Sequence, residues 1–183
     1  MKRKLLILSV LAICIATLAA GTLAYFTSEE KAHNVITTGG VEIAVQERAD
    51  ENKQTPFEEL EGIMPGMTVT KIAEIKNTGA SDAWIRVLIT KNIQLAGDGT
   101  PNTALVEPEL NIADWTEKDG YYYYKEALKP GEVTAPIFTA VTFKPEMGNE
   151  YQNATATVDV SAQAVQTANN GDTVMDAKGW PNS

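Results

Sequence analysis

The chain has 183 residues, of which 15 are basic and 24 acidic, and its net charge is −9. This acidic balance argues against a nucleic acid or an anionic membrane surface as partner, because both carry negative charge themselves. The single cysteine rules out a disulfide within the chain, and the single histidine argues against the common zinc sites, which use several histidine or cysteine ligands.

The N-terminus has the layout of a secretory signal peptide. Basic residues at 2–4 precede an apolar run at 5–20, and small residues follow up to Ala24. The run is shorter than the roughly 20 residues that a membrane anchor needs. We therefore expect residues 1–24 to enter the membrane as a signal and a signal peptidase to cut between Ala24 and Tyr25.

Removal of this signal leaves 159 residues, enough for one domain with a continuous core. The exported product contains no cysteine and carries 12 basic against 24 acidic residues, a net charge of −12. We expect it to be secreted, to reach the extracellular matrix or the cell surface, and to have three parts. These are a flexible N-terminal segment at 25–34, a domain at 35–166, and a tail at 167–183 that is either a loose end or a last strand.

Most of this product alternates apolar and polar residues with a period of two, which is typical of β-strands. Residues 84–95 are apolar on both faces and are expected to form a central strand. Further alternating segments lie at 41–45, 69–75, 137–143 and 154–165. The pattern predicts an all-β fold, an antiparallel β-sandwich of the jelly-roll type with roughly seven to nine strands.

Turn residues separate these segments. Pro65 and Gly66 precede one predicted strand, and Pro130 and Gly131 precede another. Proline presets the first dihedral of a turn and glycine supplies a positive one, so two similar turns are expected. Residues 77–79, Asn-Thr-Gly, should form a third turn.

Residue types suited to catalysis are scarce. His33 lies among polar residues near the predicted cleavage point, where an exposed ring is expected, and no zinc motif or Ser-His-Asp set is present. We expect no catalytic residue, no metal site and no cofactor. The loop at 97–102, with Asp114 or Asp119, offers oxygen atoms to calcium but lacks the carboxylate spacing of known calcium loops, so a surface turn is expected.

Four consecutive tyrosines occupy residues 121–124. In an extended segment they point alternately to opposite faces, so two of them should lie outside the core. Exposed tyrosines often contact partners, which makes Tyr122 and Tyr124 candidate subunit contacts. The alternative is an edge strand whose outer rings lie on neighbouring side chains.

A series of short motifs runs through the chain in order. They are Ala24-Tyr25-Phe26-Thr27, Thr38-Gly39-Gly40-Val41-Glu42-Ile43, Met64-Pro65-Gly66-Met67, Ile75-Lys76-Asn77-Thr78-Gly79, Trp84-Ile85-Arg86-Val87, Asp119-Gly120 followed by the four tyrosines, Lys129-Pro130-Gly131-Glu132 and Ala162-Gln163-Ala164-Val165-Gln166. Their order resembles that of the TasA and camelysin family, exported proteins of Gram-positive bacteria that a dedicated signal peptidase processes.

This resemblance implies a jelly-roll domain at the cell surface, where relatives build protein fibres of the biofilm matrix. In such fibres the N-terminal segment of one subunit completes a sheet of the next. Here the donor would be residues 25–34, with Tyr25 and Phe26 in an apolar pocket, and the partners would be copies of this chain or related fibre subunits.

Two alternatives stay open. One is a monomeric adhesion module that uses residues 121–124. The other is a zinc endopeptidase, as camelysin-type relatives are classed, although one histidine and no zinc motif argue against that activity.

Overall fold

The structure, a computed structural model, describes residues 35–37, 40–50 and 64–181. The predicted signal, its cleavage site and the segment at 25–34 lie outside these residues. The described residues belong to one compact unit and form nine strands and two short 3-10 helices, Thr103–Leu105 and Asn149–Tyr151. No helix in these ranges is long and apolar enough to cross a membrane.

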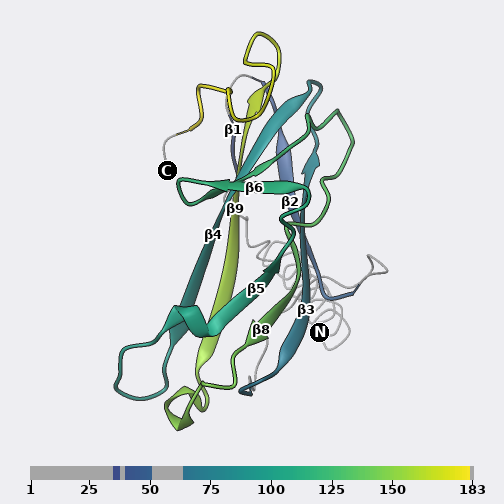
Figure 1. The fold of residues 1–183 in the computed structure, drawn as a ribbon. Helices are drawn as coiled ribbons and strands as arrows, with labels where there is room; N and C mark the ends of the chain where they lie inside the picture. Colours follow the sequence, from purple (N-terminus) through teal and green to yellow (C-terminus); the bar gives the residue numbers. More distant parts are fainter. Residues whose placement is uncertain (1–34, 38–39, 51–63, 182–183) are drawn as a thin grey trace, which may run out of the picture. The chain divides into compact units, whose positions relative to one another are not determined.

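The strands form two sheets that pack face to face (Figure 1). The first sheet has the order β1-β9-β4-β7-β6. Its strands are β1 (Val35–Thr37), β9 (Thr155–Gln166), β4 (Ala83–Gln94), β7 (Tyr121–Tyr124) and β6 (Trp115–Lys118). All neighbours are antiparallel except β1, which runs parallel to β9.

The second sheet is antiparallel throughout and has the order β2-β3-β8-β5. Its strands are β2 (Ile43–Arg48), β3 (Thr68–Asn77), β8 (Phe138–Phe143) and β5 (Val106–Leu110). The chain crosses between the sheets after β1, β3, β4, β5, β7 and β8, an alternation in keeping with a jelly-roll type of sandwich. The predicted all-β sandwich is confirmed.

The hydrophobic core lies between the two sheets, where the inward positions of the alternating segments meet. Ile75, Ile85 and Phe138 are fully buried there. The predicted central strand is confirmed, because β4 lies between β9 and β7 and both of its faces are covered. Ile85 faces the core, while Trp84 is buried on the opposite face, in a second cluster that includes Val174 of the tail.

Both Pro-Gly pairs form the predicted turns. The N–H of Met67 donates to the carbonyl of Met64 at 3.1 Å. In the second turn, the N–H of Glu132 donates to the carbonyl of Lys129 at 3.0 Å. The central glycines have φ angles of 77° and 81°, which a type II turn requires.

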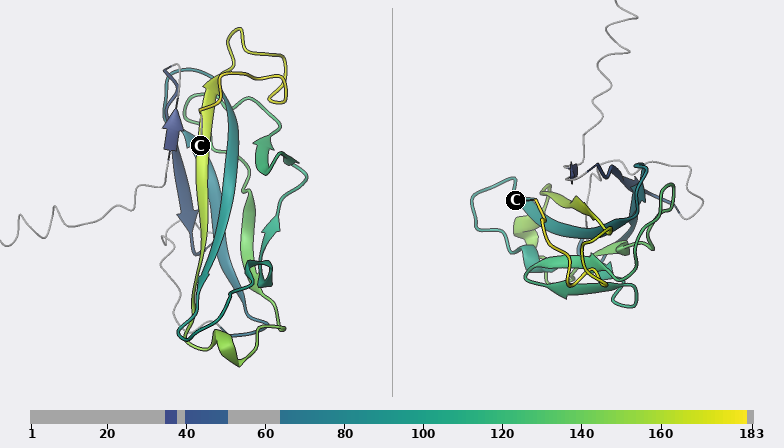
Figure 2. Two further views of the ribbon diagram at one scale, coloured as in Figure 1. Left: turned by 90° about the vertical axis from the view of Figure 1, so that its left-hand side faces the viewer. Right: turned by 90° about the horizontal axis from the view of Figure 1, so that it is seen from above.

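The tail folds back over the outer face of the first sheet, at the end where β9 finishes (Figure 2). Its described residues, 167–181, contain no strand. The side chain of Asn170 holds the loop together through hydrogen bonds to the backbone of Gln166 and Lys178. Trp180 packs edge-on against Tyr123, with ring centroids 5.7 Å apart. The tail is therefore a packed cap, neither a loose end nor a last strand.

Candidate functional site

One side of the sandwich is incompletely paired. β1 pairs only with residues 162–164 of β9, so residues 155–161 have no strand partner along that edge within the described ranges. In the other sheet β2 reaches only to Ile72, which leaves residues 68–71 of β3 without a described strand on the same side. We call this region, formed by the unpaired edges of β9 and β3, the open side.

Lys71 connects the two edges of the open side. Its Nζ atom donates to the backbone carbonyl of Val158 in β9 at 2.7 Å and lies 3.1 Å from a carboxylate oxygen of Glu47. A second ion pair, Arg48 with Glu74, lies on the same two strands at 2.5 Å. The side chains of all four charged residues are at most 11% exposed, and charged groups occupy such positions only when they are paired.

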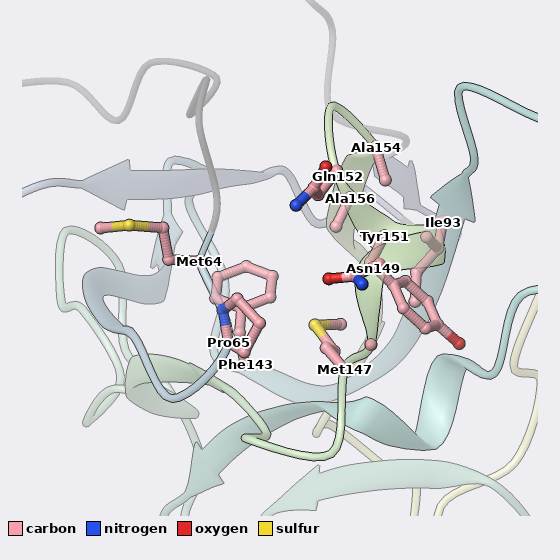
Figure 3. A pocket seen from close by; sticks show the side chains of 11 residues that line it. Met64, Pro65, Ile93, Phe143, Met147, Asn149, Tyr151, Gln152, Ala154 and Ala156 are labelled. Carbon is pink, nitrogen blue, oxygen red and sulfur yellow. The ribbon is translucent and has the colours of Figure 1, made fainter.

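A pocket of about 310 Å³ lies at the end of the open side where β9 and β3 begin (Figure 3). Phe143 and Met147 give it apolar walls, and Ala154 and Ala156 line it from the start of β9. Met64 stands at its edge with 65% of its surface exposed. An apolar pocket of this kind suits an apolar or aromatic group better than a charged one.

The polar atoms of the pocket come from the 3-10 helix Asn149–Tyr151 and the residues beside it. Asn149 and Gln152 contribute amide groups, and Gly148 contributes backbone. The exposed side chain of Glu150 lies beside Gly148 and does not line the pocket. The pocket therefore combines apolar walls with amide groups, and no charged side chain is among its lining residues.

Of the predicted site residues, Ala24, Tyr25 and Phe26 lie outside the described part of the chain, and so does His33, for which only an exposed ring is expected. The role of Tyr25 and Phe26 as subunit contacts and the cleavage site before Tyr25 stay predictions.

The tyrosine strand is described in full, and β7 lies between β4 and β6 rather than at an edge. Tyr122 and Tyr124 are partly buried and pack against the main core. Burial raises the pKa of Tyr122, and the negative charge of Glu117 raises it further. The predicted role of these two tyrosines as subunit contacts stays a prediction that their inward packing does not favour.

Tyr121 and Tyr123 belong to the cluster on the outer face of the sheet. The guanidinium group of Arg86 lies 4.0 Å from the centre of the Tyr121 ring and 4.7 Å from that of Trp180. The rings of Tyr121 and Tyr123 are thus in contact with the tail and with Arg86.

No group of three or more histidine, cysteine, aspartate or glutamate residues in the described part of the chain could hold a metal ion. Residues 96–99 form a bend, and the loop at 97–102 is exposed apart from the half-buried Pro101. The carboxylate of Asp114 accepts a hydrogen bond from the side chain of Asn111 at 2.9 Å, within a local turn.

The open side was not predicted from the sequence, yet one residue carried a signal for it. Lys71 interrupts an otherwise apolar alternation of Val69, Ala73 and Ile75. A lysine at an inward strand position needs a partner within the protein, and such a residue points to a buried polar site.

A comparison with protein families gives one match, to a model described as camelysin metallo-endopeptidase, over residues 1–104. The matched part includes β1 to β4. No curated protein and no solved structure matches the chain. A metallo-endopeptidase needs a metal site, and the described residues contain no cluster that fits one, so no catalytic step through a metal can be derived from them.

Proposed function

The chain belongs to the camelysin family, whose members are exported, and from this premise we propose that it is a structural protein of an extracellular fibre. It would act as a fibre subunit or as an accessory component in the biofilm matrix. The observation that carries the proposal is the edge of β9, where the described part of the chain supplies a partner, β1, for residues 162–164 alone.

An unpaired edge presents a row of backbone donors and acceptors to which an extended chain can bind as a further strand. The open edge of β9 has seven residues, 155–161, and the ten residues at 25–34 directly precede β1. In the observed parallel register Val35 lies opposite Ala162. Continued without a shift, that register sets Ser28 opposite Thr155, so the segment is long enough to cover the whole edge.

The supply of this strand by a second copy is compatible with the local structure. β1 has only three residues, and Gly40 follows it with a φ of 76°, a conformation that favours glycine at a chain reversal. Exchange of residues 25–37 between copies would restore the same contacts, because each acceptor meets an identical sequence. A chain of such exchanges would give an open-ended fibre.

The experiment compares three proteins by sedimentation and electron microscopy: residues 25–183, residues 35–183, and residues 25–183 with the order of 25–34 scrambled. We expect only the first to polymerise, since the second lacks the donor and the third keeps its length without its sequence. If the first and second proteins both stay monomeric, or polymerise equally, the proposal is wrong.

Peptidase activity is the second candidate, and the description of the matching family model favours it. Purified residues 25–183 should leave casein intact. Hydrolysis that a chelator abolishes and that His33→Ala removes would overturn the structural proposal.

A monomeric adhesion module has weaker support. Tyr122 and Tyr124 pack against the core, and Tyr123 is covered by the tail. Loss of binding to cells or glycans after serine replaces residues 121–124, in a variant that still folds, would support it.

A further inference from the structure

The backbone of the tail is held in place by the side chain of Asn170. Its Nδ2 atom donates to the backbone carbonyls of Gln166 and Lys178, each at 3.0 Å, and its Oδ1 atom accepts the N–H of Lys178 at 2.8 Å. An aspartate of the same shape could accept the N–H but could not donate to the two carbonyls. The loop therefore requires an amide at position 170.

The next residue, Gly171, is required by the same loop for a different reason. Its φ angle is 83°, in the left-handed region that favours glycine. A Cβ atom at this position would lie 2.9 Å from the Cβ atom of Asp176 and 3.1 Å from its carbonyl carbon. The geometry of the loop thus places an asparagine directly before a glycine, and Asn170 is the only asparagine of the chain that glycine follows.

An asparagine that precedes a glycine can modify itself. The backbone nitrogen of the glycine loses its proton and attacks the Cγ atom of the asparagine side chain. The amide nitrogen takes up a proton and leaves as ammonia, and a succinimide ring forms. Water then opens the ring at either carbonyl, which leaves aspartate or isoaspartate. Glycine favours the attack because it has no side chain to obstruct the nitrogen and because its backbone is unrestricted.

In the folded protein the contacts of Asn170 restrain this reaction. Its side-chain amide is held at both polar atoms, and its backbone carbonyl accepts the indole N–H of Trp84 at 3.2 Å. Ring closure requires the Cγ atom to swing toward the nitrogen of Gly171, and the amide must leave its partners to do so. The tail must therefore open before Asn170 reacts, and the rate follows the population of the open state.

The products cannot hold the tail as asparagine does. A carboxylate at position 170 can still accept the N–H of Lys178, but it has no hydrogen to donate to the carbonyls of Gln166 and Lys178. It instead places a negative charge beside these two oxygen atoms, which are left without their donor. Isoaspartate in addition lengthens the backbone by one methylene group. A tail that has reacted is therefore bound less firmly than before.

The tail covers apolar side chains on the outer face of the first sheet. Trp84, Tyr123 and Val165 are at most 7% exposed there, and Val174 and Trp180 of the tail pack against them. Release of the tail exposes these three side chains together. A contiguous apolar patch of this kind is a common mark of an interaction surface.

We propose that Asn170 and Gly171 form a self-modifying site, at which deamidation releases the tail and uncovers the outer face of the first sheet. The reaction needs water alone, and opening of the tail sets its rate. The inference does not depend on fibre assembly.

The first test compares the folded protein with the same protein unfolded in guanidinium chloride, both kept in mildly alkaline buffer at physiological temperature. Mass spectrometry of proteolytic peptides follows aspartate and isoaspartate at position 170. We expect the unfolded protein to deamidate there at least about tenfold faster, because the folded tail opens rarely. Asn153, which alanine follows, is the internal reference and should react slowly in both states. Equal rates at position 170 in the two states, or no reaction in either, would overturn the inference.

Two substitutions in the tail test the role of its opening. Trp180→Ala removes contacts with Tyr123 and Arg86, so deamidation of the folded variant should approach the rate of the unfolded protein. Met175→Ala changes an exposed residue of the same tail and should leave the rate unchanged. Equal rates in the two folded variants would show that docking of the tail does not control the reaction.

A third measurement follows the released tail. Asn170→Asp reproduces one product, and Asn169→Asp adds the same charge at the exposed neighbouring position. Trypsin cuts after Lys178, the only basic residue in 167–183, whose backbone N–H and carbonyl both bond to Asn170. We expect rapid cleavage there in Asn170→Asp, and resistance in Asn169→Asp and in the unchanged protein. Equal resistance of the two variants would mean that the product keeps the tail in place, and the inference would be wrong.

Discussion

Lys71 of β3 donates a hydrogen bond from its Nζ atom to the backbone carbonyl of Val158 in β9, 2.7 Å away, so a side chain of one sheet ends on the backbone of the other. The contact joins the two edges that form the open side. Because Lys71 is also paired with Glu47 at 3.1 Å, the charge is compensated in a nearly dry environment.

Removal of the positive charge of Lys71 should lower the stability of the fold. Lys71→Met leaves the buried carboxylate of Glu47 without its lysine, and breaking a buried pair typically costs about 3–5 kcal/mol. We expect the free energy of unfolding to fall by about that much in denaturant titrations, and the double variant with Glu47→Gln to recover part of it. The control is Lys144→Met, which breaks a largely exposed pair with Glu107 and should cost less than about 1 kcal/mol. Equal losses in the two single variants would contradict this view of the open side.

The turn after β3 provides a steric prediction. A Cβ atom at Gly79 would lie 2.7 Å from the backbone nitrogen of Glu42, although Gly79 has an ordinary negative-φ backbone. Gly79→Ala must therefore displace the backbone that precedes β2, and we expect it to cost about 1–3 kcal/mol in thermal or chemical unfolding. Gly97→Ala, where no atom lies within 4 Å, should change stability by less than about 0.5 kcal/mol. Equal stability of the two variants would show that the space between Gly79 and the backbone of Glu42 accommodates a methyl group, which would contradict this prediction.

The long strands could be predicted from the sequence because their alternation is regular, as in Thr155–Gln166. β5 and β6 were not predicted. Pro108 interrupts the pattern of β5 and is tolerated because β5 is an edge strand, where a missing backbone donor costs little. β6 contains one apolar residue, Trp115, followed by polar ones, and its strand character comes from pairing with the tyrosines across the type I′ turn at Asp119 and Gly120.

The open side and the packed tail could not be predicted, because each depends on contacts between distant parts of the chain. Pairing in three dimensions decides at which residue of β3 the partner strand β2 ends. It also decides how many residues of β9 pair with β1. Trp180 is an isolated apolar residue in the sequence and gains its role only by meeting Tyr123 and Arg86.

The tail yields a third prediction. Trp180→Ala removes the edge-on contact with Tyr123 and the ring beside the Arg86 guanidinium. Each aromatic or cation–π contact of this kind contributes about 0.5–1.5 kcal/mol beyond the buried area, so we expect a loss of about 2–3 kcal/mol in unfolding experiments. Met175→Ala alters a more exposed apolar residue of the same tail and should stay within about 0.5 kcal/mol of the unchanged protein. Similar stability of both variants would mean that the tail does not cap the sheet in solution.

The last prediction concerns alkaline pH. Burial, with a smaller contribution from Glu117, raises the pKa of Tyr122, so the folded protein holds this phenolic proton more tightly than the unfolded chain does. The stabilisation is fully present below the unfolded pKa of about 10 and is lost as pH rises through the folded value. We expect the absorbance titration of tyrosinate to lose a late component in Tyr122→Phe, and that component to move to lower pH in Glu117→Gln. The free energy of unfolding at pH 7 should not depend on this ionisation. If the titration curve of Tyr122→Phe keeps its late component, burial does not raise the pKa of Tyr122.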